Sequence, residues 1–254
     1  MNFKSFSILF LLGCSHTLSA QIDSLQTISL KPVEVSATRI TNSLLETTWS
    51  VSKLDFTQQQ DQMQQLTFSD YVQAVPGLFA LNSNNFSQDL RISIRGFGAR
   101  SAFGIRGIKI LVDGIPETTP DGQGQIDNLA LGSIASVEVI RGPSSLLYGN
   151  ASGGVISIQT KDVVEKNYIK PGLTLGRFGM ENLQIEAGVN RKNTTLIISA
   201  NKIKTNGYRS QSGFESSGIN ARIKHIISSK TDVNLVFNYT DSPVAEDPGG
   251  LDFD

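Results

Sequence analysis

The sequence predicts a chain in two parts, a compact α+β domain followed by the first strands of an antiparallel transmembrane β-barrel. Residues 49–165 carry one short helical pattern and several short strand patterns, each bounded by Gly or Pro. Residues 166–254 instead carry longer segments in which apolar and polar residues alternate. With their flanking residues, these segments approach the length of a tilted membrane strand, about nine to eleven residues.

The composition excludes several classes of protein. The 254 residues include 22 Lys+Arg and 23 Asp+Glu, so the formal net charge is -1. Without a basic surplus to neutralise phosphates, no nucleic-acid partner is expected. Charged residues make up 18% and there are 23 Gly, which argues against a coiled coil. No apolar run reaches the ~18 residues of a transmembrane helix.

Residues 1–20 are predicted to be a secretory signal peptide. A short positive start precedes an apolar run at residues 6–13, and small residues follow up to Ala20. An alternative is lipoprotein processing, with residues 11–14 as the cleavage box and Cys14 lipidated. Either interpretation predicts export.

Removal of residues 1–20 takes away the single Cys and one of the two His, and His225 stays. Disulfides, Cys-based metal clusters and two-His metal sites are therefore excluded. No nucleophile motif accompanies His225, so no catalytic triad is expected. The sequence predicts no enzyme, no metal site and no cofactor held by the protein itself.

Residues 21–48 are polar, with one patterned stretch at residues 32–39. Val33, Val35 and Ala37 alternate there with Glu34, Ser36 and Thr38, a period of two that suits an extended strand. Pro32 lacks an N–H and favours a free end or a sheet edge. Two interpretations stay open, a disordered tail and a strand donated to a partner's sheet.

Residues 49–165 form the predicted compact domain. A helix is expected to open at residues 66–70, where Thr67 caps it, and to close at residues 75–77. Strands are expected at residues 90–95, 108–112, 137–141 and 155–160. The polar loops between them, at residues 82–89, 98–107 and 117–127, are long for so small a domain. Long loops on a rigid sheet usually carry function or are disordered.

The alternating segments lie at residues 182–190, 195–201, 219–224 and 233–239, and within residues 195–201 only Ile197 breaks the pattern. Short turns at residues 190–193 and 228–232 contrast with a long Gly/Ser-rich loop at residues 205–217 and the start of another at residue 241. This asymmetry is typical of outer-membrane barrels, and the alternative is a soluble β-sandwich with one wet face.

Several motifs in this order resemble the N-terminal part of a TonB-dependent outer-membrane receptor. Residues 32–39 resemble the TonB box. Plug-domain signatures are similar to four stretches of this sequence, namely Ser93-Ile94-Arg95-Gly96-Phe97 and residues 111–116, 137–143 and 147–156. Residues 207–209 and 247–251 resemble the early barrel of the ferric-citrate-receptor-like branch. The resemblance covers essentially the whole chain after the signal peptide.

The resemblance implies a full-length barrel of 22 strands with the plug folded inside its lumen. It divides this chain into a signal peptide (1–20), an N-terminal segment with the TonB box (21–48), a plug domain (49–165) and the start of the barrel (166–254). Fewer than 90 residues follow the plug, enough for about five strands. The chain is therefore expected to be a fragment that ends inside an extracellular loop.

The resemblance also implies residue roles. Val33, Glu34, Val35, Ser36 and Ala37 would pair with TonB, whereas Arg95, Glu138 and Arg141 would hold the plug against the barrel wall. Arg100 and Arg106 would attract an anionic cargo, and Phe103 would stack on an aromatic one. The predicted ligand contacts are Asn84, Asn85, Arg100, Ser101, Phe103, Arg106, Thr119, Asp121 and Gln123.

The implied function is energy-coupled import of a scarce solute across the outer membrane, with an iron–siderophore or ferric-citrate-type chelate as cargo. Cobalamin or a quinone cofactor is an alternative cargo, and a soluble or surface-anchored binding module is an alternative class. A signal transducer is disfavoured, because only residues 21–31 separate the signal peptide from the TonB box. The implied partners are TonB with its inner-membrane energising complex, outer-membrane lipid and the small-molecule cargo.

Overall fold

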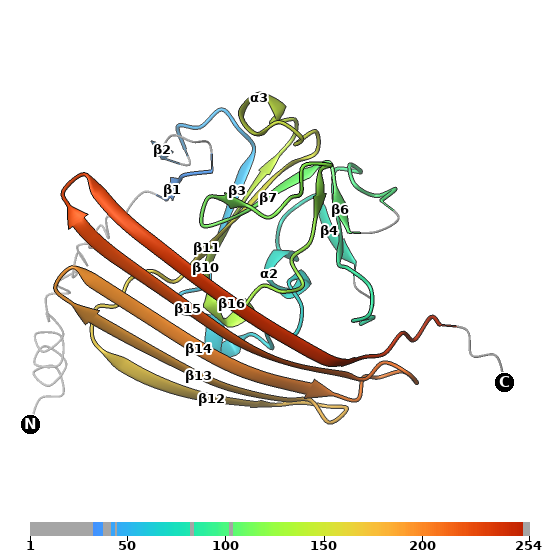
Figure 1. Ribbon diagram of the computed structural model, residues 1–254. Coiled ribbons are helices and arrows are strands. Elements are labelled where there is room, and N and C mark those ends of the chain that lie inside the picture. The colour runs from blue at the N-terminus through green and yellow to red at the C-terminus, as the bar shows by residue number, and fades with distance from the viewer. Residues whose placement is uncertain (1–32, 38–41, 44, 82–83, 102–103, 251–254) are drawn as a thin grey trace, which may run out of the picture. The chain divides into compact units, whose positions relative to one another are not determined.

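The computed structural model describes residues 33–37, 42–43, 45–81, 84–101 and 104–250 (Figure 1). The described residues all belong to one compact unit, Val33–Asp254. The predicted signal peptide, the alternative at Cys14, and Phe103 lie outside the described residues. In the part of the chain that the structure describes, no helix is long and apolar enough to cross a membrane.

The compact domain is built on a five-stranded sheet with the strand order β3-β10-β11-β7-β8. All neighbours are antiparallel except β11 and β7, which run parallel. Apolar side chains such as Ile110, Val139 and Ile156 are fully buried, so this sheet forms the core. The strands are β3 (Val51–Asp55), β7 (Ile108–Val112), β8 (Ile115–Pro116), β10 (Ile134–Arg141) and β11 (Gly154–Thr160).

Smaller elements complete the domain. Two-stranded pairs join β1 (Glu34–Val35) with β2 (Asn42–Ser43), β4 (Leu78–Leu81) with β5 (Arg91–Ile94), and β6 (Ile105–Arg106) with β9 (Gln123–Gly124). The short helices are η1 (Gln60–Gln62), α2 (Ser69–Val72), η2 (Leu131–Ser133) and α3 (Ser145–Tyr148). All four strands predicted in this domain are confirmed, as β5, β7, β10 and β11.

The predicted helix exists but is shorter than expected. Its regular part is α2, which buries Tyr71 and Val72 in the core. Phe68, not Thr67, occupies the N-cap position. The Thr67 hydroxyl still accepts a hydrogen bond from the Ser69 N–H, at 2.9 Å, so it satisfies one free donor of the first turn.

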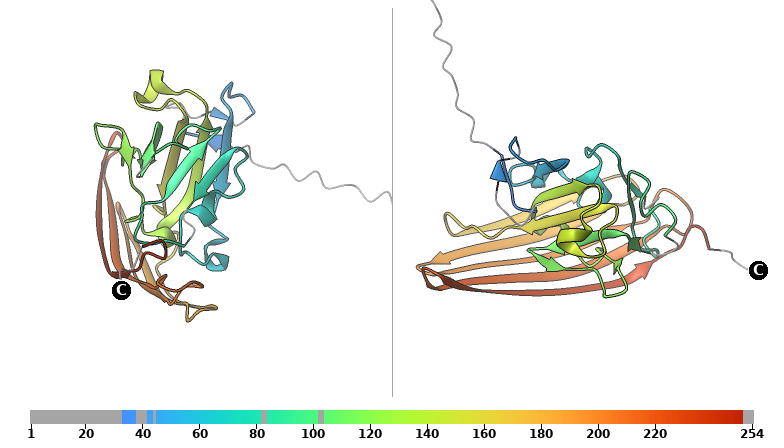
Figure 2. Two further views of the ribbon diagram at one scale, coloured as in Figure 1. Left: turned by 90° about the vertical axis from the view of Figure 1, so that its right-hand side faces the viewer. Right: turned by 90° about the horizontal axis from the view of Figure 1, so that it is seen from above.

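The second sheet contains five long antiparallel strands in chain order, β12-β13-β14-β15-β16, which run side by side in Figure 2. The predicted turns are confirmed, because Arg191 pairs with Thr194 and Ser228 with Thr231. The strands are longer than the alternating segments, so the predicted loop at 205–217 shrinks to residues 206–213, and residues 241–245 belong to a strand. The bounds are β12 (Tyr168–Leu175), β13 (Glu181–Arg191), β14 (Thr194–Thr205), β15 (Phe214–Ser228) and β16 (Thr231–Ala245).

The two faces of this long-strand sheet differ in polarity. Directly opposed residues share a face, and the register aligns one row as Ile169, Ala187, Ile198, Ala221 and Phe237. The large side chains of this row are exposed. Ile197, which breaks the sequence alternation, lies in register with Gly188 and Arg222 on the opposite face and is buried. Apolar side chains exposed on the first face include Leu173, Leu183, Ile185, Ile219, Ile223, Leu235 and Tyr239.

Candidate functional site

The first candidate site is the N-terminal segment, residues 33–37. Val35 and Ala37 are buried, whereas Val33, Glu34 and Ser36 are exposed, so the predicted period of two holds over residues 34–37 and fails at Val33. Ala37 packs in a small apolar cluster with Leu111, Ile140, Ala151 and Val155. The segment is thus seated on the central sheet of the compact domain.

Glu138 holds this segment through its carboxylate. Oxygen Oε2 accepts hydrogen bonds from the backbone N–H of Ser36 at 2.9 Å and of Ala37 at 2.7 Å. The other oxygen, Oε1, lies 3.0 Å from the Lys53 ammonium, which also donates to the Glu34 carbonyl at 2.6 Å. The Tyr148 hydroxyl donates to the Ala37 carbonyl. Side chains between 19 and 111 positions away in sequence therefore fix the backbone of this segment.

The predicted plug–wall residues make contacts inside the compact domain. Besides the contacts of Glu138, Arg95 Nη2 donates to Ser50 Oγ at 3.4 Å and Arg141 Nη1 donates to the Pro76 carbonyl at 3.2 Å. Among the described residues, none of the three bonds to β12–β16. Their role against a barrel wall stays a prediction.

Another residue, Asp113, joins the compact domain to the long-strand sheet. Its carboxylate lies 2.8 Å from Arg222 Nη1 on β15, and the two side chains are only 8% and 12% exposed. The same carboxylate accepts the Thr160 N–H at 2.9 Å and the Thr160 hydroxyl at 2.7 Å. Asp113 has a positive φ of 51°, a conformation that Asp tolerates better than most residues. No role was predicted for Asp113 or Arg222 from the sequence.

The two residues after Thr160 extend this interface. Lys161 Nζ lies 2.8 Å from Glu186 Oε2 on β13, and the Tyr168 hydroxyl donates to the same carboxylate at 2.9 Å. Asp162 lies 3.3 Å from Lys224 Nζ on β15. Three consecutive residues at the end of the compact domain thus bond to the polar face of the sheet. The only sequence signal was the alternation that places Glu186, Arg222 and Lys224 on one face.

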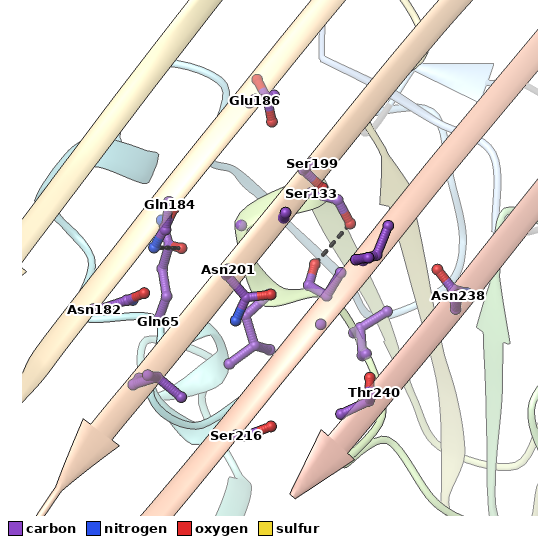
Figure 3. A pocket seen from close by; sticks show the side chains of 18 of the residues that line it. Gln65, Ser133, Asn182, Gln184, Glu186, Ser199, Asn201, Ser216, Asn238 and Thr240 are labelled. Atoms are coloured by element: carbon purple, nitrogen blue, oxygen red, sulfur yellow. Dashed lines mark hydrogen bonds between the residues drawn. The ribbon is translucent and has the colours of Figure 1, made fainter.

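A cavity of about 130 Å³ lies between the same face and the compact domain (Figure 3). Gln184 Nε2 donates to Gln65 Oε1 at 2.6 Å, and Asn182 Nδ2 donates to the Gln64 carbonyl at 3.3 Å. Amides and hydroxyls supply most of the polar groups, which suit water or a polar solute. Within the described ranges, no cluster of three or more His, Cys, Asp or Glu could hold a metal ion. The polar lining of the cavity includes Ser133, Ser199, Asn201, Ser216, Asn238 and Thr240.

Four predicted ligand residues come together around the β6–β9 pair. Arg106 Nη2 donates to Gln123 Oε1 at 3.1 Å and lies 3.7 Å from the Asp121 carboxylate. The Thr119 hydroxyl donates to Asp121, and this hydrogen bond, with one from the Gln123 N–H, lowers the pKa of Asp121. All but Gln123 are exposed. The cluster presents a cation, a carboxylate and an amide to solvent.

The other predicted ligand residues lie elsewhere. Ser101 is buried, and its hydroxyl donates to the Gly104 carbonyl at 3.0 Å, whereas Arg100 is exposed. Asn84 has a positive φ of 53° in the turn before Asn85. Ligand contact for these residues and for the β6–β9 cluster stays a prediction.

Asn85 belongs to a second junction with the long strands. Its amide donates to Asp247 Oδ1 at 2.7 Å, and the Gln88 amide donates to Asp247 Oδ2 at 3.2 Å. The adjacent Phe86 ring stacks on Phe214, with ring centroids 4.3 Å apart. Hydrogen bonds, first from the Gly249 N–H, lower the pKa of Asp247. The loop that carries Asn85 is therefore bonded to the chain that follows β16.

Comparison with known proteins relates the compact domain to a described family. Residues 43–155 match the family described as TonB-dependent Receptor Plug Domain. The compact domain is therefore a plug domain. Together with the long-strand sheet, this match supports the interpretation of the chain as part of a TonB-dependent receptor. The chain is 36% identical over 110 residues to the hemin receptor of Yersinia enterocolitica, covering 42% of this chain and 15% of that protein. It is 30% identical over 129 residues to the vitamin B12 transporter BtuB of Vibrio vulnificus, covering 50% and 20%.

Solved structures show the fold of both parts. The FpvAI–pyocin S2 complex aligns with a TM-score of 0.66 at 16% identity, over 84% of this chain and 27% of that chain. The ferripyoverdine receptor of the outer membrane of Pseudomonas aeruginosa aligns with a TM-score of 0.64 at 17% identity, over 83% and 28%. The predicted fold class, a plug followed by early strands of a receptor barrel, is confirmed.

The chain spans 15% of the length of that hemin receptor and 20% of that B12 transporter. These relatives are receptors and transporters, in agreement with the prediction that the chain is not an enzyme. The ferric-citrate-receptor-like branch is not established by these matches and stays a prediction.

Proposed function

We propose that the protein carrying this chain is an outer-membrane TonB-dependent receptor that imports a scarce solute by energy-coupled remodelling of its plug. The plug-domain match over residues 43–155 carries this proposal. The two-faced sheet supports it, because its polar face bonds to the plug and its opposite face exposes apolar side chains suited to lipid. Export by cleavage of residues 1–20 belongs to the same proposal.

The plug–sheet interface suits a plug that moves. Its described contacts are mainly ion pairs and amide hydrogen bonds. When such an interface separates, its polar groups bond to water instead. Separating an apolar interface would cost about 25 cal/mol of free energy for each Å² of apolar surface exposed to water. In the docked form, Glu138 connects the N-terminal segment to β10 of the plug.

We propose an iron–siderophore or ferric-citrate-type chelate as the cargo. Arg100 and Arg106 are exposed cations on predicted ligand loops, and such chelates are commonly anionic. Relatives named as a hemin receptor and as a probable TonB-dependent siderophore receptor, PirA of Acinetobacter baumannii, support this class. The relative named as a vitamin B12 transporter makes cobalamin the alternative, ahead of a quinone.

Val35→Pro tests the strand-donation step. Proline removes the backbone N–H that a pairing strand donates, so uptake by cells that carry the receptor should be lost while ligand binding persists. Val35→Ala shortens the side chain, keeps the N–H and should retain uptake. Uptake and ligand binding are measured with a panel of candidate cargoes, namely hemin, ferric siderophores, ferric citrate, cobalamin and a quinone.

Other outcomes assign other functions. Loss of ligand binding in Val35→Pro would mean that the segment is structural. Full uptake by Val35→Pro would contradict strand donation. A purified protein that stays folded and monodisperse without detergent would favour the soluble binding module.

A further inference from the structure

The backbone at Ser36 and Ala37 is not in the conformation of a paired strand. Both N–H groups donate to one atom, Oε2 of Glu138, at 2.9 and 2.7 Å. In an extended strand, consecutive N–H groups point to opposite edges and cannot reach one acceptor. Ala37 lies in a turn. The segment therefore cannot be held by Glu138 and paired through residues 36 and 37 at the same time.

Several other backbone groups of the segment are also engaged. Glu34 and Val35 pair with Ser43 and Asn42 of β2. The Ala37 carbonyl accepts the Tyr148 hydroxyl. A partner strand would find its main pairing groups already bonded within the plug.

Glu138 is built into the plug as a buried charge. Its side chain is 1% exposed and extends from the middle of β10, where its backbone pairs with Ser157 and Lys53. Lys53 neutralises it at 3.0 Å. Among the described residues, its other bonded partners are Ser36 and Ala37, so the charge serves the docked segment, while the sheet is held by backbone hydrogen bonds.

We propose that Glu138 is a latch, a positioning residue that keeps residues 36–37 in a bent, docked form which TonB cannot pair with. This inference rests on the proposed function and adds a required step, release of Ser36 and Ala37 from Glu138 before strand donation. The docked population lowers the apparent affinity for TonB by the fraction of segments that are free. Weakening the latch therefore tightens TonB binding.

Glu138→Gln in the intact receptor tests the latch. The amide is close in size and keeps an acceptor but loses the charge that strengthens both N–H···O bonds. The affinity of the periplasmic TonB domain for the ligand-free receptor, measured by calorimetry in micelles, should rise about tenfold. Glu117→Gln, which changes an exposed carboxylate elsewhere on the plug, should leave the affinity unchanged.

A second measurement reports undocking without TonB. Val35 is fully buried when the segment is docked, so a Val35→Cys receptor should react slowly with a maleimide. Adding Glu138→Gln should accelerate labelling about tenfold, and adding Tyr148→Phe should accelerate it less. Tyr148→Phe removes one hydroxyl and provides an independent variant should Glu138→Gln fail to fold.

The outcomes separate the two ideas. Unchanged labelling and unchanged affinity in both variants, with TonB still binding, would overturn the latch and leave the proposed function intact. Absence of TonB binding by every form of the receptor, with faster labelling in Glu138→Gln, would overturn the proposed function and with it the requirement for release.

Discussion

Neutralising Asp113 should detach the end of the plug from the long-strand sheet. In Asp113→Asn, the amide tolerates the positive φ of 51° at this position, so the backbone is not newly strained. The change removes the charge opposite Arg222, whose side chain is only 12% exposed. Arg222 then stays nearly buried without its counter-charge.

The expected cost follows from the geometry. Two unit charges about 4 Å apart attract by about 4 kcal/mol at an effective dielectric constant of about 20. Removing one partner of a buried pair costs about 3–5 kcal/mol, because the other charge is left uncompensated. We expect Asp113→Asn to lower the free energy of opening at the end of β11 by about this amount. In a double-mutant cycle that combines Asp113→Asn with Arg222→Gln, the coupling energy should be about 2–4 kcal/mol.

Native-state hydrogen exchange on the intact receptor measures this free energy segment by segment. The useful probe is the Asp113 N–H, which donates to the Ile158 carbonyl at 2.9 Å. The matched control is the pair Arg106 and Asp121, 3.7 Å apart with exposed side chains. Because solvent screens exposed pairs, a double-mutant cycle on this control pair should show no measurable coupling energy. A coupling for Asp113 and Arg222 equally close to zero would refute the claim that this contact anchors the plug.

Three further predictions concern the sheet, the plug core and pH. Leu235→Arg should destabilise the receptor in bilayers by about 2–4 kcal/mol near the midplane, whereas Asn238→Arg on the polar face should cost less; equal effects in folding titrations would contradict the assigned faces. Gly154→Ala places a Cβ 2.2 Å from the Ile140 carbonyl oxygen at a φ of +145°, so the plug should lose about 2–4 kcal/mol in denaturant titrations. Gly96→Ala, with open space around it, should cost about 1 kcal/mol. A larger loss of stability for Gly96→Ala than for Gly154→Ala would be inconsistent with this packing. Burial raises the pKa of Asp70, so its charged form disfavours folding above that pKa. Asp70→Asn should therefore stabilise the plug at neutral pH, and the gain should vanish as pH falls below the unfolded value of about 4; a gain that grows on acidification would contradict this assignment.

Local patterns in the sequence predicted much of the fold. The period of two at residues 33–37 and along β13–β16 is visible without a structure, because side chains of a strand alternate between its faces. The Gly and Pro residues that bound β5, β7, β10 and β11 mark the strand ends for the same local reason. The strands β12 and β16 were less well predicted. Pro171 and Gly172 interrupt the pattern of β12, and the polar residues 240–242 of β16 read as a loop.

The sequence by itself determined that this chain has a plug-like domain, an N-terminal segment in which apolar and polar residues alternate, and strands with one polar and one apolar face. Only the tertiary structure decided which charges meet. Ser36 and Glu138 are 102 positions apart, and the contact of Glu138 with the N-terminal segment was not predicted. Asp113 and Arg222 belong to different sheets, so their pairing depends on how those sheets pack. Alternation along a strand is a short-range steric property, whereas the partner of a buried charge is set by the packing of distant elements.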